Sequence, residues 1–479
     1  MILKERWTNL DWGLVGSIGL VAAVIRSVRL GTPKELVFDE FFYVPDACRY
    51  MLQIKDICGP TELTWMHPPL GKWMIAFGLQ VLGPNRYGWR LMAVVAGVAT
   101  IALVYVVGRC LFESRVGSVV AAGLLTFDFL HFTHSRLGMP DVFLTMFITL
   151  AVLLAVIDRD DSAHRGWFRP WRWGAGAALG AALATKWAAV PLFGAVVVLT
   201  LLWDRRGRRD RGESRAAALG STGIAFVLIP LLVYLVSYAG RFDGALLTAP
   251  WASGSWFADL FQRHTEMLDY HTASRITSTL PPHPAASPAW SWLALKRPIA
   301  YWYLETNGFY REIMAMGHVL LWPLAIPALA WLGTRATRIR DARSPSAIVT
   351  TLFLAAYVPW ILLSFTGQDV YPYYLLPGIP FMYLGFGVIA DRWRRLAWGR
   401  PAIGVVALAA VGLWFFYAPV LTTRPLSPEA WERRILFKDC VSYVDPVQDR
   451  LGLEVDLNAR STDERLTPTR TKATGWCWV

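Results

Sequence analysis

Two adjacent carboxylates, Asp39 and Glu40, lie in the apolar stretch 36–43, shortly after the first hydrophobic segment of the chain. A charge among aromatic residues at a bilayer surface is costly unless it is hydrogen-bonded, paired or used in chemistry. Burial or a neighbouring like charge also raises the pKa of a carboxylate toward the range in which it acts as a base. The pair is therefore a catalytic candidate. Asp39 could equally cap the helix expected to carry Tyr43 and Tyr50, and the pair alone does not decide between these roles.

Ionisable residues at the outer ends of the expected membrane spans form a second group of candidates. Arg90 begins the second span, and Lys186 lies in the short outer turn between the fifth and sixth. The outer turn between the third and fourth spans is bracketed by His131, His134, Arg136 and Asp141. Each has a structural alternative: Arg90 and Lys186 could reach to lipid head groups, the histidines could be satisfied at the interface, and Arg136 could pair with Asp141. The two histidines have helical spacing for a metal, but no third ligand is obvious.

Collected on one face of a membrane, these residues suit a lipid-phosphate sugar donor. Arginine or lysine holds a phosphodiester and stabilises the charge that grows on the leaving phosphate. A carboxylate opposite takes the proton of an acceptor hydroxyl as that hydroxyl attacks. No general acid is needed, because a phosphate leaves without protonation more easily than an alcohol does. The apolar tail of the donor would lie between spans, which explains why this chemistry would occur in a membrane protein.

The composition indicates an all-α polytopic membrane protein. The 479 residues are 55% hydrophobic and only 17% charged, and their mean hydropathy is +0.37. A soluble protein of this size needs more polar surface. The net charge of +12 comes from arginines in short clusters between apolar segments, where they orient spans and form no groove, so nucleic-acid binding is disfavoured. No P-loop, CxxC pair or glycine-rich nucleotide motif appears.

About eleven apolar segments approach the roughly 20 residues that a membrane-spanning helix needs. We place them at about 12–30, 88–108, 116–132, 140–157, 173–185, 190–203, 217–238, 314–333, 346–364, 372–390 and 402–418. The loops that this count assigns to the cytoplasm are the arginine-rich ones, 159–172, 205–211, 335–343 and 392–395. By the positive-inside rule the N-terminus is therefore cytoplasmic, as an uncleaved anchor, and the C-terminus lies outside.

This topology places the remaining long segments outside the cytoplasm, at about 31–87, about 239–313 and from about 419 onward. We expect a membrane-embedded domain over 1–420 and an outer tail over 421–479, with an interfacial helix over about 69–83. Four of the five cysteines fall outside, where a disulfide is chemically allowed. A Cys48–Cys58 or a Cys440–Cys477 bridge is possible, and the sequence does not decide.

The motifs that carry these residues resemble the protein O-mannosyltransferases, enzymes of the GT-C glycosyltransferase class that use dolichyl- or polyprenyl-phosphate-mannose. The similar segments follow one another in family order from residue 37 to about 380. They are 37–40 with 43–44, His67-Pro68-Pro69-Leu70-Gly71-Lys72, 88–90, 135–141, 184–187, 234–238, 270–272, 291–293, 297–299 and 373–377. The chain has no room for the lumenal β-trefoil insertion of the eukaryotic members, so it resembles the compact bacterial type.

The resemblance implies a GT-C fold with an active cavity outside the cytoplasm, inversion at the sugar carbon, and transfer of mannose to Ser or Thr of exported polypeptides. It implies Asp39 as the general base with Glu40 as its partner, and Arg90, Lys186 and Arg136 as contacts of the donor phosphate. Acceptor or cavity residues are then expected among His67, Lys72, Asp141, His271 and Arg297. The implied partners are the polyprenyl-phosphate sugar lipid, the exported polypeptide and the secretion machinery, and no metal is indicated.

Two other functions keep the same scaffold or the same spans. A related lipid-linked transferase, which moves aminoarabinose or another sugar to a lipid or glycan, would share the carboxylate and differ in its acceptor groove. A transporter or flippase usually has polar residues and broken helices near the midplane of two repeated halves. Here the ionisable residues gather at one face, which favours a transferase.

Overall fold

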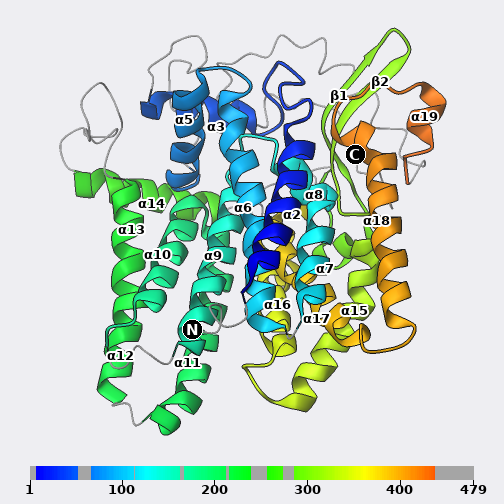
Figure 1. The fold of residues 1–479 in the computed structure, drawn as a ribbon. Coiled ribbons are helices and arrows are strands. Elements are labelled where there is room, and N and C mark those ends of the chain that lie inside the picture. Colours follow the sequence, from blue (N-terminus) through cyan, green and yellow to red (C-terminus); the bar gives the residue numbers. More distant parts are fainter. Residues whose placement is uncertain are drawn as a thin grey trace.

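The computed structural model describes residues 7–51, 66–112, 114–161, 167–211, 215–238, 256–272 and 285–436. Helices dominate this part of the chain, and most of them run side by side (Figure 1). In the first half they are α2 (Asn9–Ser27), α3 (Glu40–Met51), α5 (Leu70–Leu82), α6 (Gly88–Leu111), α7 (Arg115–Thr126), α8 (Phe129–His134), α9 (Asp141–Asp160), α10 (Pro170–Thr185), the short turn η1 (Trp187–Ala189) and α11 (Val190–Arg211). The second half contains α12 (Arg215–Gly223), a π-helical segment η2 (Ile224–Leu228), α13 (Ile229–Ser237), α14 (Trp256–Thr272), η3 (Ala289–Ala294), α15 (Leu321–Ile339), α16 (Pro345–Leu363), η4 (Pro372–Gly378), α17 (Ile379–Trp393), α18 (Gly399–Leu421) and α19 (Pro428–Glu432).

The helices confirm a polytopic membrane protein. Eight segments of the described chain are long and apolar enough to cross a bilayer. Each of the eleven predicted spans coincides with a helical segment, but some of these are short: α7 has 12 residues and α10 has 16. The count of about eleven transmembrane helices therefore stays a prediction. The tail predicted from 421 onward is described only to residue 436.

A two-stranded antiparallel hairpin interrupts the otherwise helical chain. Strands β1 (Ile299–Thr306) and β2 (Phe309–Ala315) pair from Ile299–Ala315 to Thr306–Phe309, with a bulge between Ala300 and Trp302. The predicted span 314–333 begins too early, because its first residues end β2 and the helix α15 starts only at Leu321. Residues 313–316 are apolar and all buried, so this end of the strand has the continuous apolar pattern of a span.

Small residues bring the helices into close contact. A Cβ at Gly176 of α10 would lie 1.8 Å from the backbone oxygen of Ala225 in η2, and one at Gly180 would lie 2.7 Å from the Cα of Pro230 in α13. Between α7 and α17, Gly117 and Gly387 approach each other's carbonyl oxygens in the same way. Helices in a bilayer gain little from burying apolar surface against one another, so such backbone approach is a main source of packing energy.

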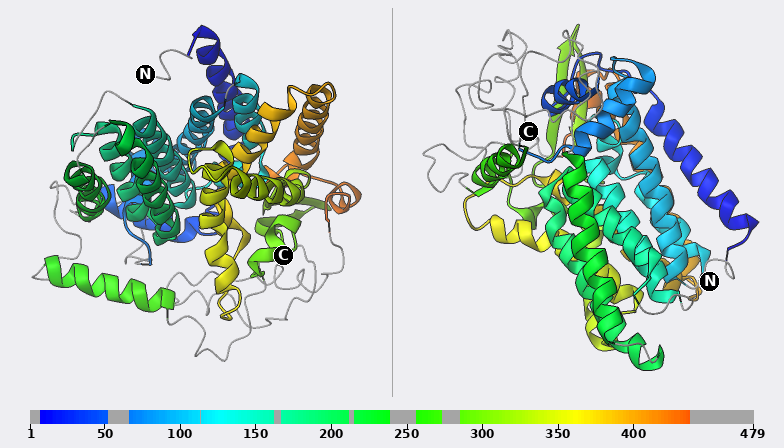
Figure 2. Two further views of the ribbon diagram at one scale, coloured as in Figure 1. Left: turned by 90° about the horizontal axis from the view of Figure 1, so that it is seen from below. Right: turned by 90° about the vertical axis from the view of Figure 1, so that its left-hand side faces the viewer.

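The two ends of the bundle differ in content. At one end lie α3, α5, the hairpin and α14, which runs across the bundle at its periphery (Figures 1 and 2). α5 has 13 residues, fewer than a bilayer span requires, and packs against α3 and α6. At the opposite end, Asp158 accepts hydrogen bonds from Arg169 and Arg172, and Arg172 binds both carboxylate oxygens of Asp204 at 2.7 Å. This buried network joins the ends of α9, α10 and α11.

Candidate active site

Asp39 lies where the loop after α2 turns into α3. Its backbone oxygen accepts from Phe42 and Tyr43, so the residue starts the helix through its main chain. Its side chain is half-buried, and among the described residues no hydrogen bond reaches the carboxylate. An N-capping carboxylate would accept a backbone N–H of the first turn. The structure therefore disfavours the capping role, and the catalytic role stays a prediction.

The surroundings of Asp39 bring the pKa of its carboxyl group close to neutral pH. Burial raises the pKa of this carboxyl to about 7, the negative charge of Asp141 adds to the rise, and the positive charge of Lys186 opposes it. A general base works best when its pKa is close to the operating pH. Asp39 thus combines an accessible carboxylate with a pKa suited to taking a proton from a hydroxyl group.

The carboxylate of Glu40 is buried and fully hydrogen-bonded within the fold. Its carboxylate receives two hydrogen bonds from Arg90, at 2.9 and 2.8 Å, and one each from the backbone N–H groups of Val37 and Gly138. The remaining N–H groups of Arg90 are donated to the carbonyl oxygens of Leu30, Pro33 and Glu35. Every donor of the buried Arg90 side chain is thus taken by protein, which leaves none for a donor phosphate. We therefore assign Glu40 and Arg90 to holding the loop before α3. The predicted contact of Arg90 with the donor phosphate has no free N–H group to form it.

Lys186 and Asp141 meet at the same end of the bundle. Lys186 follows the last residue of α10, Asp141 is the first residue of α9, and Nζ lies 3.0 Å from Oδ1. The ammonium also lies 5.4 Å from the ring centre of Tyr374. An ammonium has three donors, and only one of them bonds to a described residue. Lys186 therefore retains the donors that a phosphate would need, beside the carboxylate of Asp39.

Arg136 serves the end of α2. One nitrogen of its guanidinium donates to the carbonyl oxygens of Arg26 and Val28, at 2.6 and 2.7 Å, and to that of Ile25. The guanidinium also lies over the ring of Phe132, 5.1 Å from its centre. The last carbonyls of a helix have no partners within the helix, and a cation there complements the helix dipole. This position favours a capping role for Arg136, and its predicted contact with the donor stays a prediction.

The predicted residues His67, Lys72 and His271 lie near one another, and the charge of Lys186 reaches both histidines. Lys72 forms a buried ion pair with Asp46 at 2.9 Å, which ties α5 to α3. The ring of His67 is stacked between those of Tyr43 and His271, at 6.2 and 5.5 Å. Burial and the positive charge of Lys186 hold the pKa of His67 well below its usual range, so this histidine is neutral at pH 7.

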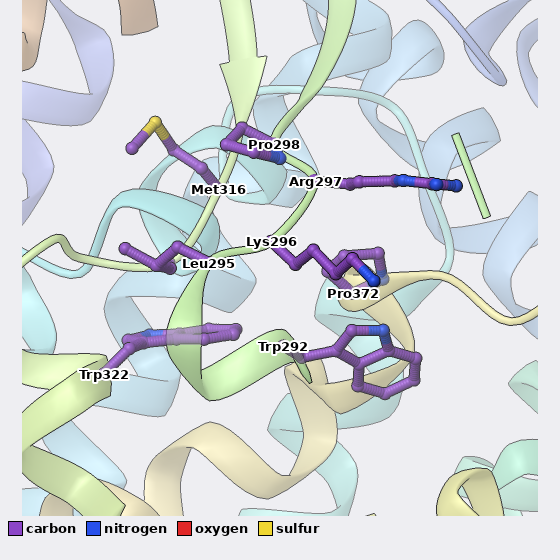
Figure 3. Close-up of a pocket in the computed structure, with 9 residues that line it drawn as sticks. Trp292, Leu295, Lys296, Arg297, Pro298, Met316, Trp322 and Pro372 are labelled. Carbon is purple, nitrogen blue, oxygen red and sulfur yellow. The ribbon is translucent and has the colours of Figure 1, made fainter. Parts of the chain in front are cut away.

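Arg297 lines a small pocket with Trp292, Lys296 and Pro372 (Figure 3). In Figure 3 its side chain extends away from Met316. Neither Asp39 nor Lys186 lines this pocket. Pro372 directly precedes the tyrosine pair 373–374, so the pocket adjoins the aromatic side of the candidate site. A role for Arg297 toward the acceptor stays a prediction.

Aromatic residues that were not among the predicted site residues surround Asp39. Its charge acts on the hydroxyls of Tyr43, Tyr301, Tyr373 and Tyr374, which come from α3, β1 and η4. Tyr43 and the pair 373–374 lie in motifs that the sequence had already singled out. Tyr301 carries no such signal, apart from being one of three consecutive aromatic residues in a segment expected to be a loop.

The cysteines and possible metal ligands add little to the site. Cys48 is disulfide-bonded and Cys110 is free, whereas Cys58, Cys440 and Cys477 lie outside the described residues. Within the part of the chain that the structure describes, no group of three His, Cys, Asp or Glu side chains is placed to hold a metal ion.

Two family models match consecutive parts of the chain. One, described as dolichyl-phosphate-mannose-protein mannosyltransferase, matches residues 66–234. The other, described as the C-terminal four TMM region of protein-O-mannosyltransferase, matches residues 256–440. The chain belongs to the protein O-mannosyltransferase family. The motif of Asp39 and Glu40 precedes both matches, and the second match includes the hairpin and the pocket of Arg297.

Relatives of this family member resemble it along nearly their whole length. The polyprenol-phosphate-mannose–protein mannosyltransferase of Mycobacterium tuberculosis H37Rv is 29% identical, with 88% of this chain and 91% of the relative covered. The Corynebacterium glutamicum protein of the same name is 28% identical, with 87% and 90% covered. Coverage of this extent includes parts of the chain on both sides of the hairpin.

Two solved structures share the fold of this family member. The Saccharomyces cerevisiae Pmt1–Pmt2 complex bound to the sugar donor matches with a TM-score of 0.72 and 13% identity, covering 92% of this chain and 95% of that chain. ArnT from Cupriavidus metallidurans bound to undecaprenyl phosphate matches with a TM-score of 0.53 and 19% identity, covering 85% and 65%. At these identities the likeness concerns the fold, which confirms the expected GT-C architecture.

Proposed function

We propose that this protein transfers mannose from a polyprenyl-phosphate-mannose donor to the hydroxyl of Ser or Thr in exported polypeptides, with Asp39 as the general base. The observation that carries this proposal is the free, half-buried carboxylate of Asp39, with its pKa of about 7, beside the Lys186–Asp141 pair. The family membership and the names of its relatives support the donor and the acceptor class.

The reaction is a single displacement. The acceptor oxygen forms a bond to the anomeric carbon of mannose while its proton passes to the Asp39 carboxylate. The bond from the anomeric carbon to the phosphate oxygen breaks on the opposite face of the sugar, and its electron pair leaves with the polyprenyl phosphate. Attack opposite the leaving group inverts the configuration. The ammonium of Lys186 stabilises the negative charge that grows on the phosphate.

The other charged residues keep this arrangement in place. Asp141 fixes the ammonium of Lys186 from the start of α9, and it raises the pKa of the base through its charge. The buried Glu40–Arg90 pair holds the loop that ends in Asp39. His67 and His271, stacked beside Tyr43, are our candidates for contacts with the acceptor.

We also propose an orientation of the protein in the membrane. The N-terminus is cytoplasmic, the C-terminus lies outside, and the active end of the bundle faces the extracytoplasmic side. The apolar chain of the donor lies among the transmembrane helices. An acceptor that arrives unfolded from the secretion machinery offers its hydroxyl groups before folding hides them.

The direct test is mannosyl transfer by Asp39→Asn in nanodiscs, with labelled polyprenyl-phosphate-mannose and a Ser/Thr-rich peptide. Asparagine keeps the size of the side chain but cannot accept the proton, so we expect turnover to fall by roughly 10²–10⁴-fold while donor binding is retained. In the parent protein the deprotonated base is the active form, so activity should rise with pH through about 7. The exposed Glu305→Gln, in the outer part of the hairpin, is the control for loss of a carboxylate that does not contact the loop of the base.

One result would contradict the proposed base, and another would contradict the proposed sugar donor. Asp39→Asn activity within a few-fold of the parent would remove Asp39 from the mechanism. Transfer of another sugar from its polyprenyl phosphate, with none from the mannose donor, would keep the base and replace the substrate. This alternative deserves a place in the assay because ArnT, which was solved with undecaprenyl phosphate, has the same fold.

A further inference from the structure

The residue before the proposed base has an unusual conformation. Phe38 has a φ of 49°, in the left-handed region that bulky side chains rarely adopt. Such a conformation persists only where the surroundings hold it, and it is found most often at functional sites. Because Phe38 and Asp39 share a peptide bond, whatever holds the backbone of Phe38 also fixes the direction of the Asp39 side chain.

The ring of Tyr301 holds Phe38. The two rings are stacked with their centres 4.0 Å apart and their planes within 9° of parallel. Tyr373 of η4 closes the arrangement, edge-on to both rings at 5.9 and 6.1 Å. The short distance makes this a close face-to-face contact between a residue of β1 and the residue that precedes Asp39.

Tyr301 is itself fixed from behind. Its hydroxyl lies 2.9 Å from Nε2 of His134, and both side chains are buried. The strand that carries Tyr301 has its bulge at this residue, between Ala300 and Trp302, and a bulge redirects a side chain. The hydroxyl of Tyr301 is fixed by His134, and its ring contacts those of Phe38 and Tyr373. The side chain therefore has little freedom to turn.

The hairpin is anchored to the elements on both sides of Asp39. The indole of Trp302 donates to Glu35 at 3.0 Å, in the loop that leads to Phe38, and the hydroxyl of Thr133 in α8 donates to the carbonyl of Met314 in β2 at 2.9 Å. On its outer edge β2 pairs with the chain after α18, through the reciprocal bonds of Tyr310 and Leu426. The hairpin is thus a rigid support that spans from α8 and α18 to the loop of the base.

We propose that Tyr301, oriented by His134, is a positioning residue for Asp39, and that the hairpin exists in this fold to hold the base in its reactive direction. The inference rests on the proposed role of Asp39. Loss of the stack would free Phe38 to return to a negative φ, which would swing the carboxylate away and let water reach it.

The pH profile of activity reports this role separately from stability. The groups that face Asp39 from the surrounding elements are Lys186 after α10, Asp141 of α9, Tyr43 of α3, Tyr301 of β1, and Tyr373 and Tyr374 of η4. Burial is the largest cause of the raised pKa of Asp39. Water admitted beside Tyr301 would therefore lower that pKa, and the acid side of the profile would move to lower pH.

The test compares Tyr301→Leu and Tyr301→Phe with Tyr303→Leu, for kcat, KM of the donor and the pH profile. Tyr303 lies in the same strand but contacts Tyr310 and Trp431 at the outer edge, so its substitution removes a tyrosine ring from the hairpin without touching Phe38. We expect Tyr301→Leu to lower kcat by about 10–100-fold with KM nearly unchanged and to shift the acid limb down by at least one pH unit. Tyr301→Phe keeps the stack and should have a smaller effect, whereas Tyr303→Leu should behave as the parent.

A second variant approaches the stack from the other side. Phe38→Leu keeps an apolar side chain but loses the ring contact, and it should reproduce the shift if Tyr301→Leu does not fold. A folded Tyr301→Leu or Phe38→Leu protein with the parent kcat and pH profile overturns the inference. An active Asp39→Asn protein overturns the proposed function instead, so the two failures are distinguishable.

Discussion

At the scale of single residues, the cations of the site differ in how many of their donors the fold uses. Arg90 donates every N–H group to Glu40 and to carbonyl oxygens of the loop before α3. Arg136 donates through one guanidinium nitrogen to the end of α2. Lys186 bonds to Asp141 and has donors to spare among the described residues. All three residues are cations at span ends, so the sequence cannot distinguish a phosphate ligand from a helix cap. Their contacts in the folded protein do.

A double-mutant cycle on Lys186 and Asp141 tests this distinction. Lys186→Met alone leaves a buried carboxylate without its partner, which typically costs about 3–5 kcal/mol, so a loss of activity could arise from misfolding. Asp141→Asn removes that charge. If Lys186 binds the donor phosphate, the double variant Lys186→Met/Asp141→Asn should regain thermal stability but remain at least tens-fold weaker in donor binding, as expected for a lost charge-assisted contact worth about 1.5–3 kcal/mol.

The readouts are the thermal unfolding midpoint in detergent and donor affinity by titration. Asp141→Asn alone serves as the control, because it keeps the ammonium. Parent-like donor affinity in the double variant would return Lys186 to a purely structural ion pair.

The sequence located the residues of the site better than it assigned their roles. Asp39 and Lys186 were expected on one face, and the structure places the charge of Lys186 close enough to act on Asp39. Glu40 was expected to assist the base, and instead binds Arg90. Which carbonyl or carboxylate satisfies a given arginine depends on the crossing of α2, α6 and the loop between them, and such contacts between distant segments leave no local pattern.

At the scale of elements, close helix packing fixes the position of the helix that leads to Lys186. α10 carries Lys186 at its end and lies against η2 and α13 with glycines at the contact. The apolar periodicity of such helices was visible in the sequence, and each predicted span coincides with a helical segment. The hairpin was not predicted. Residues 313–315 at the end of β2 are apolar and buried on both faces of the strand, and this uninterrupted apolar pattern is also that of a helix start.

Gly176→Ala should separate α10 from η2. The new Cβ would meet the backbone oxygen of Ala225 at 1.8 Å, which no side-chain adjustment relieves. We expect destabilisation by about 1–3 kcal/mol, as for an overpacked core, with reduced transferase activity because Lys186 moves with its helix. The control is Gly194→Ala in α11, where nothing lies within 4 Å of the added Cβ and alanine favours the helix. An unchanged unfolding midpoint for Gly176→Ala would show that this contact is looser than described.

At the scale of the whole molecule, α9 connects two groups of charges. Asp141 begins the helix at the active site, and Asp158 lies near its other end in the network with Arg169 and Arg172. At 1.5 Å per residue the two carboxylates are separated by about 26 Å along the axis, which is close to the thickness of the hydrocarbon core. We therefore infer that the bilayer lies between them, with the candidate active site at one face and the arginine network at the other.

Cysteine labelling in intact cells determines which face is outside. Thr306, at the exposed tip of the hairpin, should react as Thr306→Cys with an impermeant maleimide, because we place the hairpin with the active site outside the cytoplasm. Ala397, exposed in the arginine-rich turn between α17 and α18, should react as Ala397→Cys only after the cells are permeabilised. A Cys110→Ser background removes the free thiol of the described residues, and the same background without an added cysteine gives the baseline. Labelling of Ala397→Cys alone in intact cells would invert the protein and place the site where an exported polypeptide never passes.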